Sequence, residues 1–307
     1  MRTVRVHALE SDFSALGFGC APLGSMVSAS NGMRAINLAM DLGVNWFDVA
    51  PNYGGGNAET LLGKSLGANR KSVAICTKIS LLPPVRNPIP PILRPTVRWV
   101  MKSIPIGWRA ARSRRRQWIE RPQLDAAFIE KSLVSSLKRL QTDYVDVVAL
   151  HDPDVRESTA PDVIEALERM VEKGYARTAA IAGSLDAVIA GASQSDVFRI
   201  VQIRDTLLTI SAASDRVYPV RNPFVITHGA FSDLYLEQRA RKMFADAGYS
   251  LADFSKQALN FAFSKNPDGI VIASMFSRQH IKANCEVSAR ISSADATRLA
   301  NYIRDGN

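Results

Sequence analysis

The sequence predicts an α/β fold of the (β/α)8 TIM-barrel type, with a long basic insertion after the third strand. Eight short apolar runs typical of strands occur along the 307 residues, and amphipathic segments typical of helices separate nearly all of them. Alternation of this kind indicates parallel strands joined by helical crossovers. Eight such units in a chain of this length fit one closed barrel, so we assign residues 1–307 to a single domain.

The eight strands are expected at 16–19, 45–49, 72–78, 144–151, 176–182, 198–203, 223–227 and 269–274. Helices are expected at 33–43, 57–67, 126–140, 160–174 and 184–194, with two more within 233–265 and two after the last strand. A doubly wound open sheet is the alternative. It is disfavoured because "GFGCAP" at 17–22 has only two of the three glycines of a dinucleotide-binding turn, and Pro22 stands where the helix of that turn would begin.

Three residues mark the ends of the first two helices. Gly43 closes the first helical pattern, at the position where a glycine often ends a helix. Asn57 is expected to cap the second helix. Glu59 falls in the first turn of that helix, where a negative charge suits the helix dipole.

The composition indicates a cytoplasmic protein without a metal site. No apolar run reaches transmembrane length, and the N-terminal "MRTVRVHALESDF" lacks the apolar segment of a secretory signal. Cys20, Cys76 and Cys285 are far apart, which suits reduced thiols. None of the four histidines pairs with a cysteine or another histidine at metal-ligand spacing, and "HDPD" at 151–154 is weak evidence for a metal.

The insertion at 81–122 has an unusual charge. It contains ten basic residues and one acidic residue, so it carries the whole formal charge of +9, and the rest of the chain is balanced. It is rich in proline and contains Trp99, Trp108 and Trp118. Four interpretations are open: a solvated loop, replacement contacts to phosphates over the site, an anionic membrane surface, or an acidic partner. No nucleic-acid-binding motif accompanies the charge, so no specific nucleic acid is expected.

Four polar residues stand at or just after the ends of successive predicted strands. Asp48 ends the second strand and Tyr53 follows it in the loop, while Lys78 ends the third strand and His151 ends the fourth. Because strand ends of a parallel barrel meet at one face, these side chains are expected to converge there.

The four residue types share a coherent chemical role. A lysine ammonium favours the phenolate of a nearby tyrosine, and an aspartate keeps a buried lysine charged. A histidine opposite them can orient a substrate carbonyl by a hydrogen bond. The set therefore suits proton donation to a carbonyl that is being reduced. A different enzyme class is the second interpretation, since Lys78 also has the placement of a Schiff-base lysine.

Several longer motifs resemble the aldo-keto reductase family, and its aldose dehydrogenase-like branch in particular. They are "LGFGCAPLG", "LAMDLGVNWFDVAPNYGGGNAETLLGKSLG", "CTK", "SLVSSLKRLQTDYVDVVALHDPD" and "EKGYAR", within 14–80 and 123–178. The resemblance implies a (β/α)8 barrel and a catalytic tetrad of Asp48, Tyr53, Lys78 and His151. It also implies NADPH as cofactor, with Tyr53 as the general acid in the reduction of an aldehyde, ketone or sugar carbonyl, or in the reverse oxidation.

The resemblance is less close on the cofactor side. Gln202 matches the family's carboxamide-binding glutamine, and Ser277, Arg278 and Asn284 match residues near the phosphate and the helix that follows it. Ala182 and Gly183 stand where the family has a Ser-Asn pair, and Thr227 or His228 stands where it has an aromatic residue. A third interpretation follows: a barrel with a degenerate cofactor site that binds a membrane or a partner through 81–122.

Overall fold

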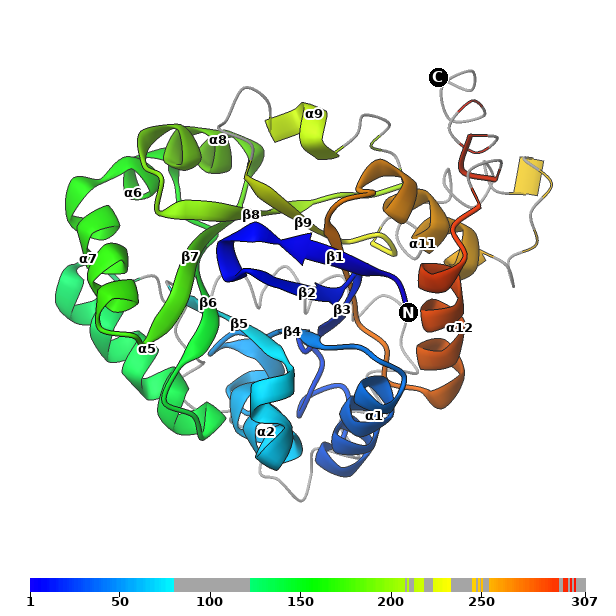
Figure 1. Cartoon of the computed structure of the whole chain (residues 1–307), viewed down its shortest axis with the longest axis horizontal. Coiled ribbons are helices and arrows are strands. Elements are labelled where there is room, and N and C mark those ends of the chain that lie inside the picture. The colour runs from blue at the N-terminus through cyan, green and yellow to red at the C-terminus, as the bar shows by residue number, and fades with distance from the viewer. Residues whose placement is uncertain are drawn as a thin grey trace, which may run out of the picture.

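The computed structural model describes residues 1–79, 122–207, 213–217, 223–232 and 254–292, with short runs at 209, 245–246, 248, 250, 295–297, 299 and 301. Figure 1 shows the described part as a ring of strands with helices around it. Nearly all of the basic insertion at 81–122 lies outside the described residues, so its binding to a membrane or an acidic partner stays a prediction. The assignment of residues 1–307 to one domain also stays a prediction.

Eight parallel strands form a closed barrel in the order β10-β3-β4-β5-β6-β7-β8-β9. They are β3 (Leu16–Gly19), β4 (Trp46–Asp48), β5 (Ala74–Ile79), β6 (Val145–His151), β7 (Ala176–Gly183), β8 (Phe198–Arg204), β9 (Phe224–His228) and β10 (Ile270–Ala273). Each overlaps one predicted strand. The predicted TIM barrel is therefore confirmed, and the open-sheet alternative is wrong.

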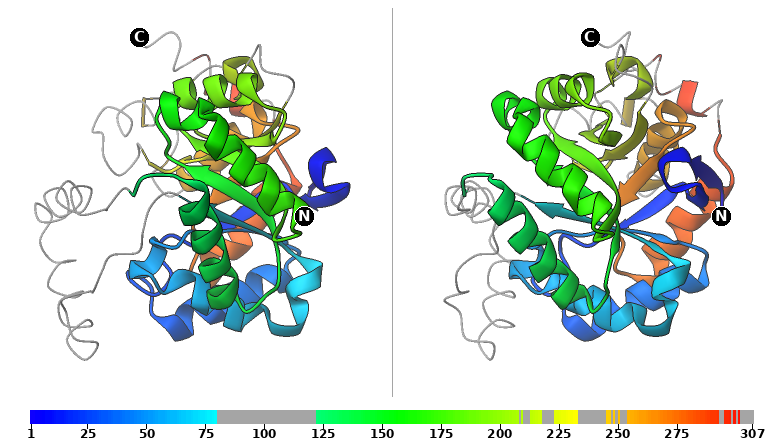
Figure 2. Two further views of the ribbon diagram at one scale, coloured as in Figure 1. Left: turned by 90° about the vertical axis from the view of Figure 1, so that its left-hand side faces the viewer. Right: turned by 60° about the vertical axis from the view of Figure 1, so that its left-hand side comes forward.

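The helices lie outside the barrel, as Figures 1 and 2 show. They are α1 (Ala29–Asp41), α2 (Ala58–Leu66), α5 (Ala126–Leu140), α6 (Val155–Thr159), α7 (Pro161–Glu172), α8 (Leu185–Gln194), α9 (Ala213–Val217), α11 (Phe254–Lys265) and α12 (Arg278–Ala289). Helix α5 has the predicted bounds. Helix α1 begins four residues before the predicted start, because the Ser28 hydroxyl caps it by accepting a hydrogen bond from the Asn31 amide at 3.4 Å.

The predictions for the helix ends are partly confirmed. Gly43 has a φ of +88° after α1, as its predicted role requires. Asn57 precedes α2, but its side chain donates to the Gly54 carbonyl at 3.3 Å and does not cap the helix. Glu59 lies in the first turn of α2, yet it is buried and bonded to other elements, so its main role is not the helix dipole.

An antiparallel hairpin of β1 (Thr3–Val6) and β2 (Ser11–Ser14), joined by the short 3-10 helix η1 (His7–Leu9), covers the N-terminal end of the barrel. The Phe13 ring packs edge-on against Trp46 at the start of β4, with ring centroids 5.5 Å apart. Arg177 at the start of β7 donates to the Leu9 carbonyl at 2.7 Å. The hairpin was not predicted, and it covers part of the end of the barrel opposite the predicted catalytic residues.

A large side chain lies inside the barrel at the start of β4. Trp46 is fully buried, and its ring lies close to Gly17 and Ile272. A Cβ atom on Gly17 would lie 2.3 Å from the Ile272 side chain and 3.0 Å from Trp46 Cδ1. A side chain at 17 therefore requires the Ile272 and Trp46 side chains to shift, because these two already occupy the space.

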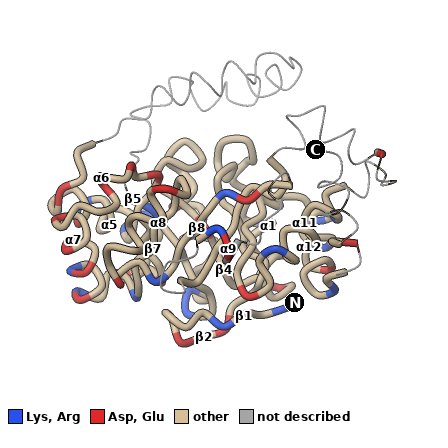
Figure 3. The backbone as a smooth tube through the Cα atoms, turned by 90° about the horizontal axis from the view of Figure 1, so that it is seen from above, with Lys and Arg blue, Asp and Glu red and all other residues tan. Residues whose placement is uncertain are grey.

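Charged residues of both signs are interspersed over the outer helices of the described part, as Figure 3 shows. This agrees with the balanced charge of the chain outside 81–122. Among the helices that the structure describes, none combines the length and the apolar character needed to cross a bilayer.

A buried carboxylate joins two helices to β5. The Glu59 side chain is 1% exposed and accepts hydrogen bonds from Thr77 Oγ1 and from Arg139 Nε on α5, both at 2.6 Å. Thr77 precedes Lys78 in β5. The carboxylate therefore fixes α2 and α5 against the strand that carries a predicted site residue.

We expect the Arg139→Met substitution to lower the free energy of unfolding by about 2 kcal/mol, because it leaves the buried Glu59 carboxylate without its cation. Arg169→Met on α7 is the control, since Arg169 lies 3.6 Å from the exposed Glu165 and such pairs contribute less than about 0.5 kcal/mol. Urea denaturation monitored by circular dichroism measures both changes. Equal losses in the two variants would contradict the role assigned to Glu59.

Candidate active site

The register of the barrel places the predicted catalytic side chains on its inner surface. Paired residues of neighbouring parallel strands face the same way, and every second residue of a strand faces the same side. Asp48 pairs with Cys76, and Lys78 lies two residues further along β5. Lys78 pairs with Ala149, His151 pairs with Ala182, and Ala182 pairs with Gln202. These side chains therefore share one interior, near the C-terminal ends of their strands.

Lys78 and Asp48 form a buried ion pair. Lys78 Nζ lies 2.5 Å from Asp48 Oδ1, and the two residues are 2% and 3% exposed. The same ammonium donates to the Val49 carbonyl at 3.4 Å. Burial alone would lower the pKa of Lys78, but the Asp48 carboxylate and the neighbouring Tyr53 raise it more strongly, so the net pKa is raised. The lysine is therefore charged at neutral pH.

The loop after β4 brings the Tyr53 ring to this ion pair. Tyr53 begins the 3-10 turn η2 (Tyr53–Gly55), and its amide donates to the Ala50 carbonyl at 3.0 Å. Gly54 has a φ of +61°, and a Cβ atom there would lie 1.7 Å from the Leu23 carbonyl oxygen. Only glycine therefore fits at position 54, directly after Tyr53. Lys78 Nζ lies 5.0 Å from the centroid of the Tyr53 ring.

The pKa of the Tyr53 phenol corrects one detail of the sequence-based interpretation. Burial raises this pKa to about 12, because the neighbouring Lys78 ammonium lowers it only in part. Lys78 thus acts in the predicted direction, but the net shift is upward. The phenol is consequently protonated at neutral pH, as a proton donor must be.

Cys76 lies against the ion pair on the same inner surface. It is buried and pairs with Asp48 in the register of β4 and β5. Burial raises the pKa of its thiol to about 12, and Lys78 lowers it in part, so the side chain is a neutral thiol. All three cysteines are free and buried, in agreement with the expected reduced state.

His151 completes the predicted catalytic cluster. Its ring lies edge-on to the Tyr53 ring at 85°, with centroids 6.0 Å apart. The residues after His151 have structural roles. Asp152 has a φ of +54°, and Asp154 caps α6 by a reciprocal capping box with Glu157. Within the described residues, no group of three or more His, Cys, Asp or Glu side chains is arranged to hold a metal ion.

The loop after His151 also explains the glycine at 183. The Asp152 amide donates to the Ala182 carbonyl at 2.6 Å, so the loop folds over the end of β7. A Cβ atom on Gly183 would lie 3.2 Å from Pro153 Cδ and 3.3 Å from Asp152 Cα. A longer side chain at 183 has no room without a shift of this loop.

The four predicted cofactor residues fall into two places. Gln202 lies inside the barrel, is 3% exposed, and its Oε1 has no hydrogen-bond partner among the described residues. Ser277 and Arg278 are exposed at the start of α12, where the Ser277 hydroxyl caps the helix by accepting from the His280 amide at 3.1 Å. Asn284 is buried, and its amide donates to Met275 Sδ at 3.7 Å. The structure does not bring these last three residues next to Gln202.

Two inner residues lie at the ends of β8 and β9. Arg204 was not predicted, and His228 was one of two alternatives for a single position. His228 pairs with Arg204, two residues beyond Gln202, so both lie on the inner side of their strands. Thr227 pairs with Ile203 and faces outward, which decides between Thr227 and His228 in favour of the histidine. Arg204 was not predicted, although its spacing of two residues from Gln202 was a readable signal.

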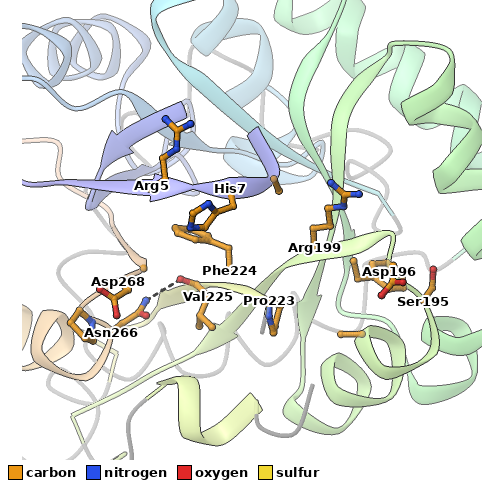
Figure 4. Close-up of a pocket in the computed structure, with 15 residues that line it drawn as sticks. Arg5, His7, Ser195, Asp196, Arg199, Pro223, Phe224, Val225, Asn266 and Asp268 are labelled. Carbon is orange, nitrogen blue, oxygen red and sulfur yellow. Dashed lines mark hydrogen bonds between the residues drawn. The ribbon is translucent and has the colours of Figure 1, made fainter. Parts of the chain in front are cut away.

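A separate groove of about 620 Å³ lies at the N-terminal end of the barrel. Figure 4 shows it between the hairpin residues Arg5 and His7 on one side and Phe224, Arg199 and Asp268 on the other. None of the predicted catalytic residues lines it. The groove is therefore distinct from the cluster around Tyr53.

The fold and the site together are a parallel (β/α)8 barrel with a tyrosine, a buried lysine–aspartate ion pair and a histidine near the C-terminal ends of its strands. The sequence profile of the Aldo/keto reductase family matches residues 15–217, well over half of the chain. The chain therefore belongs to the aldo-keto reductase family.

Similar proteins include two sugar dehydrogenases. L-Galactose dehydrogenase of Arabidopsis thaliana is 29% identical over 178 residues, which are 55% of this chain and 44% of the relative. D-threo-Aldose 1-dehydrogenase of a Pseudomonas species is 28% identical over 211 residues, 66% of this chain and 60% of the relative. The chain spans about half the length of the curated relatives it matches.

Among solved structures, the aldo-keto reductase from Klebsiella pneumoniae in complex with NADPH has the same fold. It superposes with a TM-score of 0.69 and 19% identity over 99% of this chain and 94% of its own. At this identity the likeness establishes the barrel and its topology.

The raised pKa of Tyr53 gives a prediction for stability against pH. A neutral buried phenol stabilises the folded chain below the ordinary tyrosine pKa, and this contribution is lost as pH rises from about 10 to about 12. We therefore expect the wild-type chain to lose stability relative to Tyr53→Phe across this interval. Urea midpoints of the two proteins at pH 8, 9.5 and 11 measure their difference in stability. A difference that does not change with pH would contradict the raised pKa of Tyr53.

Proposed function

We propose that the chain is an NADPH-dependent oxidoreductase that reduces an aldehyde, ketone or sugar carbonyl, or catalyses the reverse oxidation. The observation that carries the proposal is the contact between the Tyr53 ring, the buried Lys78–Asp48 ion pair and the His151 ring. Family membership and the sugar dehydrogenases among its relatives support the reaction class.

Gln202, one of the residues inside the barrel, fits the carboxamide of a nicotinamide. The unpartnered Gln202 Oε1 is buried and inward-facing, so it suits a carboxamide N–H, and a buried polar atom without a partner is costly unless a ligand satisfies it. Ala182 beside it offers no polar group. Ser277 and Arg278 at the exposed N-terminus of α12 suit a phosphate, as does the helix end itself. When bound, NADPH supplies the hydride that adds to the carbonyl carbon.

The proton comes from the chain. The Tyr53 phenol is protonated at neutral pH and donates its proton to the carbonyl oxygen as that oxygen becomes an alkoxide, which gives the alcohol. Lys78 stabilises the phenolate left behind, because its ammonium is held beside the phenol by Asp48. His151 orients the carbonyl from the opposite side of the Tyr53 ring. In the oxidation the same phenolate accepts the proton.

The geometry argues against a Schiff base on Lys78. An amine must lose its proton before it attacks a carbonyl. Burial favours that loss, but Asp48 at 2.5 Å opposes it and the net pKa of Lys78 is raised. Lys78 is therefore assigned to electrostatic support of Tyr53.

We expect Tyr53→Phe to bind NADPH with unchanged affinity and to lose turnover by a factor on the order of 1,000, since only the proton donor is removed. Fluorescence titration with NADPH and with NADH gives the affinities, and NADPH consumption with aldehydes and aldoses gives the turnover. Absence of NADPH binding to the wild type at millimolar concentration would overturn the proposed function. Unchanged turnover in the variant would overturn the role of Tyr53.

We expect Gln202→Leu to weaken NADPH binding about tenfold, because the leucine fills the same space without the amide group. Gln194→Leu, at the far end of α8 and exposed, is the matched control and leaves the affinity unchanged. The same fluorescence titration measures both. Equal affinities for the two variants would remove Gln202 from the cofactor site.

A further inference from the structure

A buried carboxylate lies directly behind the ends of β8 and β9. Asp205 follows the last residue of β8, and its amide donates to the carbonyl of His228 at the end of β9 at 2.8 Å. The side chain of Asp205 is 1% exposed. Because side chains alternate along an extended strand, Asp205 faces the outer helices, whereas Gln202, three residues earlier, faces the interior. The carboxylate therefore lies on the helix side of the wall that Gln202 lines.

Two cations from separate helices hold this carboxylate. Lys265, the last residue of α11, has its Nζ atom 2.9 Å from both Asp205 Oδ1 and Asp205 Oδ2. Arg216 on α9 donates through Nη1 to Asp205 Oδ1 at 2.9 Å and through Nη2 to the Arg204 carbonyl at 2.8 Å. Lys265 is buried as well. Removal of one member of such a buried group is destabilising, because it leaves an opposite charge without its partner.

The same ammonium fixes the start of the loop after β8. Lys265 Nζ donates to the Thr206 carbonyl at 2.8 Å and to the Thr209 carbonyl at 2.7 Å. The Thr209 amide in turn donates to the Thr206 carbonyl at 3.1 Å, which closes a turn. Together with the Asp205 carboxylate, these acceptors match the three N–H groups of an ammonium. Lys265 thus ties the end of β8 and the first turn of the loop to one helix.

This network is close to the cofactor side of the barrel and remote from the catalytic cluster. Gln202 on β8 matches the carboxamide-binding glutamine, and His228 at the end of β9 stands where the family has an aromatic residue. The predicted catalytic residues belong to β4, β5, β6 and the loop after β4, and β7 separates β6 from β8. A displacement of the ends of β8 and β9 therefore affects the cofactor side first.

We propose that Asp205 is a positioning residue for the proposed cofactor site. Its pairing with Lys265 and Arg216 fixes the ends of β8 and β9 from the helix side, and so holds Gln202 and His228 in place for a nicotinamide. The inference rests on the proposed function. It adds a group that touches neither cofactor nor substrate. Such support is needed because the chain leaves the sheet after Asp205, where Lys265 rather than a neighbouring strand holds its carbonyls.

Asp205→Asn tests this role, because it keeps the shape of the side chain and removes its charge. The matched control is Asp146→Asn near the start of β6, at the opposite end of the barrel. Asp146 is also buried and is likewise paired with two cations, Arg70 at 3.0 Å and Arg177 at 3.2 Å. We expect both variants to have a lower urea midpoint, but only Asp205→Asn to bind NADPH about tenfold more weakly in fluorescence titration.

A double variant separates positioning from stability. Asp205→Asn combined with Lys265→Met no longer leaves a buried ammonium without its carboxylate, so its urea midpoint rises above that of Asp205→Asn. The loop carbonyls still lack their donor, so the NADPH affinity stays low. An affinity that recovers together with the midpoint overturns the inference. So does an affinity that falls equally in Asp146→Asn.

Hydrogen exchange gives a readout without the cofactor. In protein free of NADPH, we expect the amides of 198–207 and 224–228 to exchange faster in Asp205→Asn than in the wild type, as measured by mass spectrometry. Asp146→Asn leaves the exchange of these two segments unchanged. Equal exchange in Asp205→Asn and the wild type overturns the inference. Absence of NADPH binding to the wild type overturns the proposed function instead, and the exchange still decides whether Asp205 holds these strand ends.

Discussion

The buried ion pair between Lys78 and Asp48 is the interaction on which the site depends. Two charges removed from water are costly, and they are tolerated only when their geometry is fixed. The register of β4 against β5 supplies that geometry, and the Val49 carbonyl accepts a second hydrogen bond from Lys78 at 3.4 Å, whereas Asp48 Oδ2 is buried without a partner among the described residues. Glu59 holds the neighbouring Thr77 from outside the barrel, and the N-terminal hairpin closes the far end. Glu59 thereby supports the strand that carries Lys78.

The ion pair and the phenol have complementary protonation states. Burial keeps Tyr53 neutral, whereas the nearby carboxylate keeps Lys78 charged. A neutral acid beside a permanent cation is poised to release its proton when a negative charge develops next to it, and not before. The tight turn at Gly54, which leaves no room for a side chain, holds the ring in this position.

Much of this arrangement could be predicted from the sequence, because polar residues at successive strand ends converge in any parallel barrel. The alternation of apolar and amphipathic segments similarly predicted all eight barrel strands. The hairpin of β1 and β2 was not predicted, because its strands are short and carry charges on their exposed side. The direction in which the pKa of Tyr53 shifts was not predicted, because it depends on the balance between burial and the Lys78 charge. Burial is known only once the chain is packed. Arg204 could have been predicted, since it follows Gln202 by two residues, the spacing at which side chains of a strand face the same side.

The crowding of Gly183 by the loop after β6 has a consequence for the history of the chain. Position 183 and the Asp152–Pro153 bend are in van der Waals contact, so a change at one is tolerated only in the presence of a particular residue at the other. A side chain at 183 requires the bend to give way by a few tenths of an ångström. The bend also leads into the cap of α6, so the shift is transmitted to the start of that helix. The residue at 183 and the conformation of the bend are thus coupled.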